Sequence, residues 1–159
     1  MKNKGLLFIL IAVLSISCNQ NVYYEKMDTI ENETWSMNQK LVYEFDIKDS
    51  TQFYDIYFNV RNTTDYPYQN LYVFLNNQFP TGKEMMDTLG CNLCDPFGKW
   101  YGKGEGRIKE NKFLLRKKVR FQKKGTYVFT VQHAMRDENL KGIASFGITF
   151  EHSKIEKNK

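Results

Sequence analysis

The sequence predicts an all-β protein: an antiparallel β-sandwich of seven to eight strands, jelly-roll-like in arrangement, behind an N-terminal signal segment. Aromatic residues make up 15% of the 159-residue chain, with twelve Phe and ten Tyr, and such residues favour strands over helices. Apolar and polar residues alternate with period two in several segments, as expected of half-buried strands. Turn-forming residues separate these segments and no long stretch has helical periodicity, which is the pattern of a sandwich.

The first predicted strands lie between residues 41 and 75. Residues 41–47 and 56–60 alternate between inward apolar and mostly polar positions, and Phe53 is expected to join the buried set. The polar residues 49–51 lie between these two strands, so we expect an antiparallel hairpin. Residues 71–75 are apolar on both faces, which favours a central strand.

The second half of the chain adds four expected strands. A short one at 85–89 interrupts the long connection 76–106, and the other three lie at 113–121, 127–131 and 143–150. In the last strand, Ala144, Phe146, Ile148 and Phe150 are expected to share one face. Residues 134–140 favour a helical turn, closed by Gly142.

The N-terminus has the three parts of a secretory signal. Residues 1–4 are basic, residues 6–16 are apolar, and the small Ser15 and Ser17 precede Cys18. A cysteine directly after this site is typical of a bacterial lipoprotein, in which the thiol carries a diacylglycerol and the new amino terminus a further fatty acid such as palmitate. The apolar run is shorter than the roughly 20 residues of a transmembrane helix. The alternatives are an ordinary cleaved signal and an uncleaved anchor.

These observations divide the chain into four segments. We expect a lipoprotein signal peptide at 1–17, a lipidated tether at 18–34 that becomes an edge element around 22–24, a β-sandwich at 35–153 and a charged tail at 154–159. The net charge of +5 falls to +3 when Lys2 and Lys4 leave with the signal. An exported chain does not routinely meet nucleic acid, so lipid headgroups, envelope polymers and acidic protein surfaces are the more plausible anionic partners.

Several short stretches in the middle and end of the chain match a known pattern in order and spacing. They are Arg61 and Asn62, residues 66–71, Asp87 and Thr88, Leu93 and Asp95, residues 98–100 and 102–104, Gln132, Met135 and Arg136, and residues 140–143. Together they resemble the GldH-type gliding-motility lipoproteins. The resemblance implies an exported lipoprotein of the surface-motility machinery, with no enzymatic activity and no cofactor.

The Cys91 and Cys94 pair leaves several chemistries open. Two cysteines with two residues between them could form a structural disulfide, remain free thiols, act as a redox pair or supply half of a zinc site. Asp95 follows directly and would disfavour a thiolate. Zinc needs about four ligands, and only His133 and His152 remain, far from the pair in sequence. A lone His133 is expected to be structural rather than catalytic.

A basic run marks the strand expected at 113–121. Arg116, Lys118 and Arg120 would share one face of a regular strand. One interpretation is a solvated edge strand, in which basic residues discourage pairing with other sheets. The other is a basic stripe that faces anionic headgroups or a partner.

Loop residues, many of them aromatic, supply the candidate interaction surface. Trp100 and Tyr101 lie among glycines and Tyr66 and Tyr68 lie on another loop; they could bind a partner, or Trp100 could fold back and cap the sandwich. The full set is Arg61, Asn62, Tyr66, Tyr68, Asp87, Asp95, Lys99, Trp100, Tyr101 and Arg136.

The functional prediction is a membrane-anchored, non-catalytic component of the motility or secretion machinery that acts through protein–protein contacts. No acidic residue follows Cys18 for six positions, which favours the periplasmic face. The alternative is an envelope carbohydrate-binding module that uses Trp100 and the Tyr66–Tyr68 loop.

Overall fold

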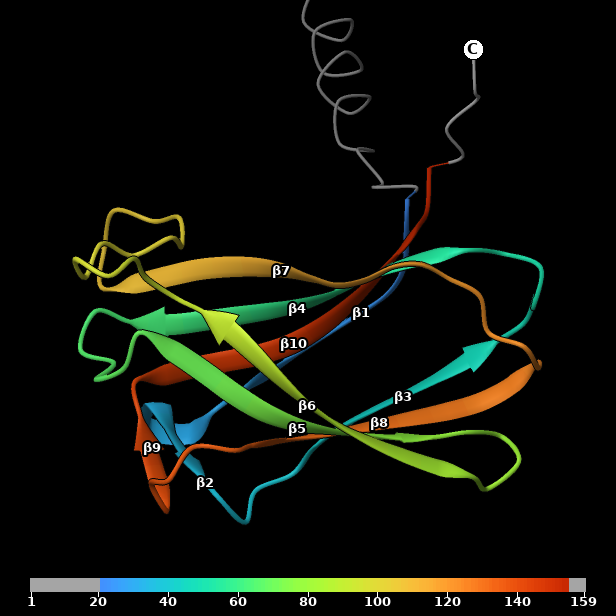
Figure 1. The fold of residues 1–159 in the computed structure, drawn as a ribbon, viewed down its shortest axis with the longest axis horizontal. Helices are drawn as coiled ribbons and strands as arrows, with labels where there is room; N and C mark the ends of the chain where they lie inside the picture. Colours follow the sequence, from blue (N-terminus) through green and yellow to red (C-terminus); the bar gives the residue numbers. More distant parts are fainter. Residues whose placement is uncertain (1–20, 155–159) are drawn as a thin grey trace, which may run out of the picture.

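The computed structural model describes residues 21–154 (Figure 1). Within them, eight strands form two four-stranded antiparallel sheets, and two short strands form a third small sheet. The elements in chain order are β1 (Val22–Thr29), the 3-10 turn η2 (Glu31–Glu33), β2 (Thr34–Ser36), β3 (Leu41–Ile47), β4 (Tyr54–Thr63), β5 (Asn70–Gln78), β6 (Glu84–Asn92), β7 (Ile108–Val119), β8 (Gly125–His133), β9 (Asn139–Lys141) and β10 (Ile143–His152).

The strand order confirms the predicted jelly-roll sandwich. One sheet has the order β1-β10-β4-β7 and the other β3-β8-β5-β6, and every pairing is antiparallel. Apart from the adjacent β5 and β6, successive strands of these sheets alternate between the two layers. An eight-stranded double sheet with this connectivity is a jelly roll.

The core lies between the inward faces of the two sheets. In β3, Tyr43 and Phe45 are buried while their neighbours along the strand are exposed, as the period of two requires. The Phe45 ring meets the Phe150 ring edge-on at 4.5 Å, and the Tyr43 hydroxyl donates to the Phe146 carbonyl at 3.0 Å. Both contacts join β3 to β10 across the sandwich. Burial of each such side chain contributes roughly 1.5–3 kcal/mol.

The prediction of a hairpin between residues 41 and 60 is wrong. β3 pairs with β8, whereas β4 pairs with β10 and β7 in the opposite sheet. The connection 48–53 therefore crosses between layers. Both arrangements leave the same alternating pattern in each strand, so periodicity does not distinguish them. The crossing also changes which residue enters the core: Phe53 is 45% exposed, and its neighbour Tyr54 is buried instead.

Two further local expectations are corrected. Residues 134–140 contain no helical turn; they lead into β9, which pairs with β2 and places Leu140 opposite Trp35. A register shift between Ile143 and Ser145 takes Ala144 out of the regular face of β10, while Phe146, Ile148 and Phe150 remain fully buried. The extra residue of a β-bulge breaks the alternation that the sequence pattern assumes.

The sandwich begins earlier in the chain than residue 35. β1 pairs with β10 from Val22 to Thr29, and Ile30 is buried, so this part of the expected tether is an edge strand. Because β1 lies at an edge and none of its residues is buried, its hydrophobic pattern is weak. Cys18, the signal at 1–17 and residues 155–159 of the expected tail lie outside the described residues.

The two ends of the sandwich differ. Three loops gather at the end drawn at the left in Figure 1, which we call the loop end: residues 64–69, 93–107 and 134–138. We call the opposite end the terminal end; its connections are residues 48–53, 79–83 and 120–124. Val22 pairs there with Glu151, and Tyr54 pairs with both His152 and Val119. β4 spans ten residues, so the ends lie roughly 30 Å apart at about 3.3 Å per residue.

Candidate functional site

Hydrogen bonds join the three loops of the loop end. The backbone N–H of Leu93 donates to the Gln69 carbonyl at 2.8 Å, which ties the chain after β6 to the chain before β5. The Tyr68 hydroxyl donates to Asp137 Oδ2 at 2.8 Å, which ties in the loop after β8. The loops therefore form one connected surface rather than three independent segments.

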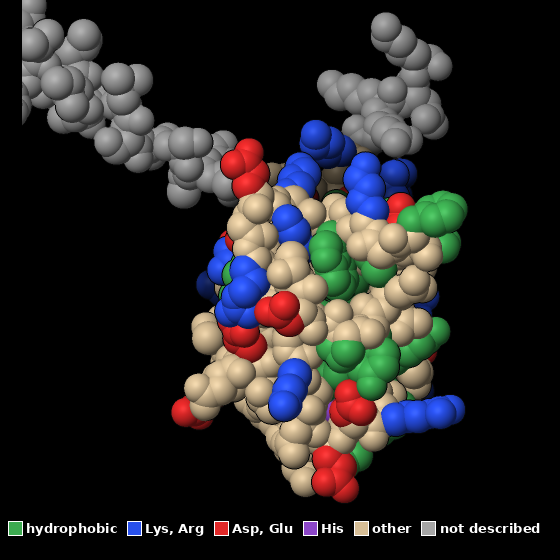
Figure 2. All heavy atoms as spheres, turned by 90° about the vertical axis from the view of Figure 1, so that its left-hand side faces the viewer, with side chains coloured by type: hydrophobic (Ala, Val, Ile, Leu, Met, Phe, Trp, Pro, Cys, Tyr) green, Lys and Arg blue, Asp and Glu red, His purple; other side chains and the backbone are tan. Residues whose placement is uncertain are grey.

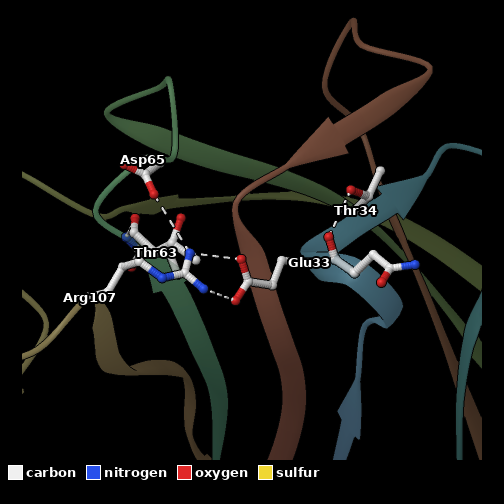
Figure 3. A network of polar contacts seen from close by, with 7 residues as sticks. Glu33, Thr34, Thr63, Asp65 and Arg107 are labelled. Atoms are coloured by element: carbon white, nitrogen blue, oxygen red, sulfur yellow. Dashed lines mark hydrogen bonds and ion pairs between the residues drawn. The ribbon is translucent and has the colours of Figure 1, made fainter.

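A cluster of ion pairs around Arg107 also connects elements at the loop end (Figure 3). The Arg107 guanidinium binds both carboxylate oxygens of Glu33, with Nη1 to Oε2 at 2.8 Å, and lies 3.6 Å from Asp65 Oδ2. The two N–H···O bonds from Arg107 hold the pKa of the Glu33 carboxyl below its ordinary value, and Glu33 in turn raises the pKa of Arg107. The contact joins η2, the β4–β5 loop and the end of the β6–β7 connection.

A buried amide pair positions the glycine-rich part of the β6–β7 connection. Asn111 Nδ2 on β7 donates to Asn62 Oδ1 on β4 at 2.9 Å, and Asn62 donates to the Thr63 carbonyl at 3.0 Å. Gly102 lies directly against this pair, because a Cβ added there would come within 2.8 Å of Asn111 Nδ2. The glycine therefore permits a close approach that any side chain would block.

Aromatic side chains are exposed on this braced end. Asp95 Oδ1 accepts the backbone N–H groups of Phe97 and Lys99, each at 2.9 Å, and fixes a turn with Phe97 at its tip. Phe97 is 96% exposed and Tyr101 is 60% exposed. Figure 2, which faces the loop end, shows hydrophobic side chains running down one side of it. A large aromatic held in water by a fixed turn is typical of a contact surface.

The structure brings most of the predicted interaction residues to the loop end, but not all. Asn62 and Tyr66 are buried, so their expected exposure is wrong: Asn62 belongs to the amide pair, and the Tyr66 hydroxyl donates to the Asn70 carbonyl at 2.8 Å. Asp87 lies on β6 away from these loops and pairs with Arg116 at 3.0 Å. The remaining residues lie on or beside the loop end: Arg61, Tyr68, Asp95, Lys99, Trp100, Tyr101 and Arg136.

Trp100 and Tyr101 each take one of the two roles considered for Trp100, which were packing on the sandwich and exposure for binding. The Trp100 side chain is partly buried against the core, and its backbone forms an isolated antiparallel bridge with Cys94. The Tyr101 side chain is exposed to solvent. The buried Tyr66 ring meets the Tyr68 ring edge-on, at 5.8 Å and 76°. Tyr66 and Tyr68 therefore do not form a flat platform that would stack on a sugar ring.

The predicted basic stripe is broken by the strand that carries it. β7 is an edge strand, as one interpretation required, but its pairing with β4 shifts register twice between Leu114 and Val119. Lys118 has a positive φ of 54° at this irregularity. Arg116 and Arg120 line a cavity between the sheets, and Lys118 does not. The three residues therefore do not form one continuous face.

The cysteine pair consists of free, buried thiols in the structure. Burial raises the pKa of Cys91 to about 12, and burial together with the Asp95 carboxylate raises the pKa of Cys94. A raised pKa opposes the thiolate that a redox pair or a metal site needs. The disulfide between Cys91 and Cys94 stays a prediction.

Residues 21–154 also define what this part of the chain does not contain. No group of three or more His, Cys, Asp or Glu side chains there could hold a metal ion. No helix in the same range is both long and apolar enough to cross a bilayer.

A family model described as GldH lipoprotein matches residues 22–150, which is nearly the whole described sandwich. The chain belongs to the GldH lipoprotein family. This confirms the resemblance seen in the sequence and makes the chain a gliding-motility-type lipoprotein, anchored to a membrane of the cell envelope. No enzymatic activity is attached to the family description.

Two relatives match along almost their full length. The gliding motility lipoprotein GldH homolog of Christiangramia forsetii is 34% identical over 154 residues, covering 92% of this chain and 94% of the relative. The gliding motility lipoprotein GldH of Flavobacterium johnsoniae is 29% identical over 158 residues, covering 95% and 97%. Among solved structures, the Yersinia pseudotuberculosis-derived mitogen is 6% identical with a TM-score of 0.38, covering 86% of this chain and 92% of that one. The jelly-roll assignment rests on the strand order and not on this likeness.

Phe97 is a candidate functional residue that the sequence did not single out. Residues 95–98 were recognisable as a turn, since Asp, Pro and Gly are turn formers. An aromatic residue inside such a turn has no neighbours to cover it. An aromatic residue within a predicted turn was therefore the sequence feature that could have identified Phe97 as exposed.

Proposed function

We propose that this lipoprotein is a non-catalytic, periplasm-facing component of the gliding-motility or secretion machinery, and that its loop end docks on another envelope protein. The observation that carries the proposal is Phe97, almost fully exposed on a turn that Asp95 fixes, with the exposed Tyr101 in the same β6–β7 connection. Membership of the GldH lipoprotein family supports the place in the motility machinery. The exposed aromatic side chains on hydrogen-bonded loops support docking on another protein.

The position of the lipid anchor supports the choice of this end. If Cys18 is acylated, four residue steps separate it from Val22, and four extended residues reach about 14 Å at most. β1 begins at the terminal end, so the anchor holds that end near the membrane. The loop end then lies roughly 30 Å farther along the sandwich. Anchoring also raises the concentration of the docking surface near partners in the same membrane.

The chemistry of the surface suits protein contact rather than catalysis. Aromatic and arginine side chains are enriched at the energetically important positions of protein interfaces, and the loop end exposes Tyr68, Phe97, Tyr101 and Arg136. Two of its carboxylates hold the loops in place: Asp95 accepts backbone N–H groups, and Asp137 accepts the Tyr68 hydroxyl hydrogen. Docking needs only a rigid, exposed surface, and this arrangement supplies one.

The test compares two variants in living cells of the source bacterium. In Phe97→Ser/Tyr101→Ser the two exposed aromatics are removed, and in the control Met86→Ser an equally apolar, 71% exposed side chain is removed from the outer face of β6. After chemical crosslinking of whole cells, the tagged wild type and the control should retain the same envelope proteins. For the double variant, the recovered amount of these proteins should fall at least tenfold, which corresponds to a loss of about 1.4 kcal/mol or more in binding free energy. The abundance of the double variant in the membrane should be unchanged.

Retention of all partners by the double variant would contradict docking through the loop end. The carbohydrate alternative has its own measurement, a Trp fluorescence titration with envelope glycans. We expect no saturable change, because Tyr66 is buried and Trp100 packs on the core. A saturable change that Tyr68→Ala abolishes would favour the carbohydrate-binding module instead.

A further inference from the structure

A cavity of about 450 Å³ opens between the two sheets where their edge strands β6 and β7 face each other. β6 and β7 do not pair with each other, so the two sheets are not joined along this edge of the sandwich. The opening lies in the half of the edge that is nearer to the terminal end. The walls are apolar and come from both layers: Ile56, Leu115 and Val119 from one sheet, and Leu75, Leu89 and Phe129 from the other. The volume lies within the roughly 300–1,000 Å³ range of small-molecule sites.

A buried polar side chain lies among these apolar walls. Leu71, Val73 and Leu75 on β5 face the core, and Asn77 continues the same row into the cavity. Asn77 is only 9% exposed, and among the described residues its Oδ1 has no hydrogen-bond partner. A buried amide oxygen without a donor is costly. An ionised carboxylate only accepts hydrogen bonds, so in this cavity it would pair with the Asn77 Nδ2–H, and Oδ1 would need a donor such as a water molecule.

The lining carries an excess of positive charge. Its cations are Lys83, Arg116, Arg120 and Lys123, and its single carboxylate is Asp87. Arg116 pairs with Asp87 at 3.0 Å across the gap between the sheets, which leaves Lys83, Arg120 and Lys123 without a carboxylate among the lining residues. An anionic group bound here would meet several cations at once.

We propose that this inter-sheet cavity binds a long-chain anionic amphiphile, in its simplest form a fatty acid. The apolar walls receive the hydrocarbon chain, since burial of each methylene is favourable. The lining cations and the Asn77 Nδ2–H receive the carboxylate, which must be paired when it leaves water. The acyl chains expected on Cys18 carry no anionic group, so the charge of the lining favours a separate ligand over the chain's own anchor.

Photo-crosslinking tests this site in the lipidated protein. The full-length mature lipoprotein is reconstituted in phosphatidylcholine vesicles with a diazirine-bearing palmitic acid, irradiated and mapped by peptide mass spectrometry. We expect labels concentrated in the cavity segments 75–89 and 115–129. Unlabelled palmitate should compete, and hexadecanol, which has the same chain without the charge, should compete at least fivefold more weakly.

Two variants separate charge from shape. Lys83→Glu/Lys123→Glu reverses two lining cations and should lower labelling at least fivefold. The control Lys40→Glu/Lys141→Glu makes the same charge change at exposed lysines outside the cavity and should leave labelling unchanged. Leu89→Trp fills the cavity and should reduce labelling by the acid and by a diazirine-bearing hexadecanol alike.

Three results would overturn the proposal. Labels spread evenly over the surface would show partition into the vesicle only, and equal competition by hexadecanol would remove the role of charge. Crosslinks between the cavity segments of two chains would assign the opening to a dimer interface. The Phe97→Ser/Tyr101→Ser variant should label normally, so this outcome and that of the docking test are independent.

Discussion

The loop end and the terminal end close the same sandwich in different ways. At the loop end, buried Trp35, the Asn62–Asn111 amide pair and the Arg107 contact hold the loops on the core. At the terminal end, the sheets stay apart between β6 and β7, and basic side chains surround the gap. The comparison shows that the two ends can serve different purposes. The loop end holds exposed aromatic side chains in fixed positions, whereas the terminal end leaves the space between the sheets open to solvent.

The largest expected effect tests what supports the loop end. Trp35 is fully buried, its Nε1–H donates to the Gln39 carbonyl at 3.0 Å, and its ring lies 5.4 Å from that of Phe146. Trp35→Ala should lower the free energy of unfolding by about 3–5 kcal/mol, measured by urea denaturation. The control at the other end is Phe53→Ala, which removes a half-exposed ring and should change stability by about 0.5 kcal/mol or less. Similar losses in both variants would remove the contrast.

Two glycines of the same connection sharpen the comparison within the loop end. Gly102→Ala places a methyl group within 2.8 Å of the Asn111 amide, whereas a Cβ at Gly106 meets nothing within 4 Å. Gly102→Ala should cost about 1–3 kcal/mol in thermal or chemical unfolding, as for other overpacked sites, and Gly106→Ala should be nearly neutral. Equal stability of the two variants would show that the connection is free to shift away from the amide pair.

The pH dependence of stability tests the buried side of the loop end. Burial lowers the pKa of His133, whose ring lies 5.7 Å from that of Trp35. The unfolded chain therefore takes up this proton first, and stability should fall as pH drops below about 6.5. One proton limits the slope to about 1.4 kcal/mol per pH unit. His133→Leu should flatten the slope between pH 7 and 5, measured by urea denaturation; an unchanged slope would assign it to other groups.

A local effect is expected from the ion contact of Figure 3. Arg107→Gln should speed amide hydrogen exchange several-fold in residues 31–33 and 64–69 without moving the global unfolding midpoint, because exposed ion pairs contribute little to overall stability. Arg61→Gln is the matched control, since Arg61 pairs with Glu110 on the neighbouring strand at 2.9 Å. Faster exchange throughout the sandwich would mean that the contact supports the whole fold.

The smallest effect concerns reactivity alone. Cys91 and Cys94 are both buried with raised pKa values, so iodoacetamide should label neither in the native protein at pH 8. In denaturant without reductant, both should be labelled, as read by mass spectrometry. Labelling that appears only after reduction would establish the disulfide instead.

The sequence predicted the layers of this fold better than their connections. Alternation at Tyr43 and Phe45 follows from burial of one face alone, so it was readable locally. The same alternation occurs whether β3 turns back as a hairpin or crosses to the other sheet, so that choice depended on partners distant in the chain. The edge position of β1 was predicted only around residues 22–24 and not over its full length, because an edge strand without buried residues has little pattern to read.

The candidate site was predictable in composition but not in exposure. Trp100, Tyr101 and Tyr68 were recognisable as loop aromatics, and the structure gathers them at one end. Whether each points outward depends on hydrogen bonds formed after folding, such as the one that buries Tyr66 against Asn70. The cavity was not predictable, because its lining combines residues from both sheets, such as Leu75 on β5 and Leu115 on β7, which are distant in the chain.

The pairing of β1 with β10 has a consequence for the order of events during export. The first strand of the sandwich has the last strand as its sheet partner, with Val22 opposite Glu151. A chain that emerges amino terminus first therefore cannot complete this sheet until nearly all of it has been delivered. Residues Val22–Thr29 lack this sheet partner throughout that interval, so the first strand of the sandwich is among the last to be paired.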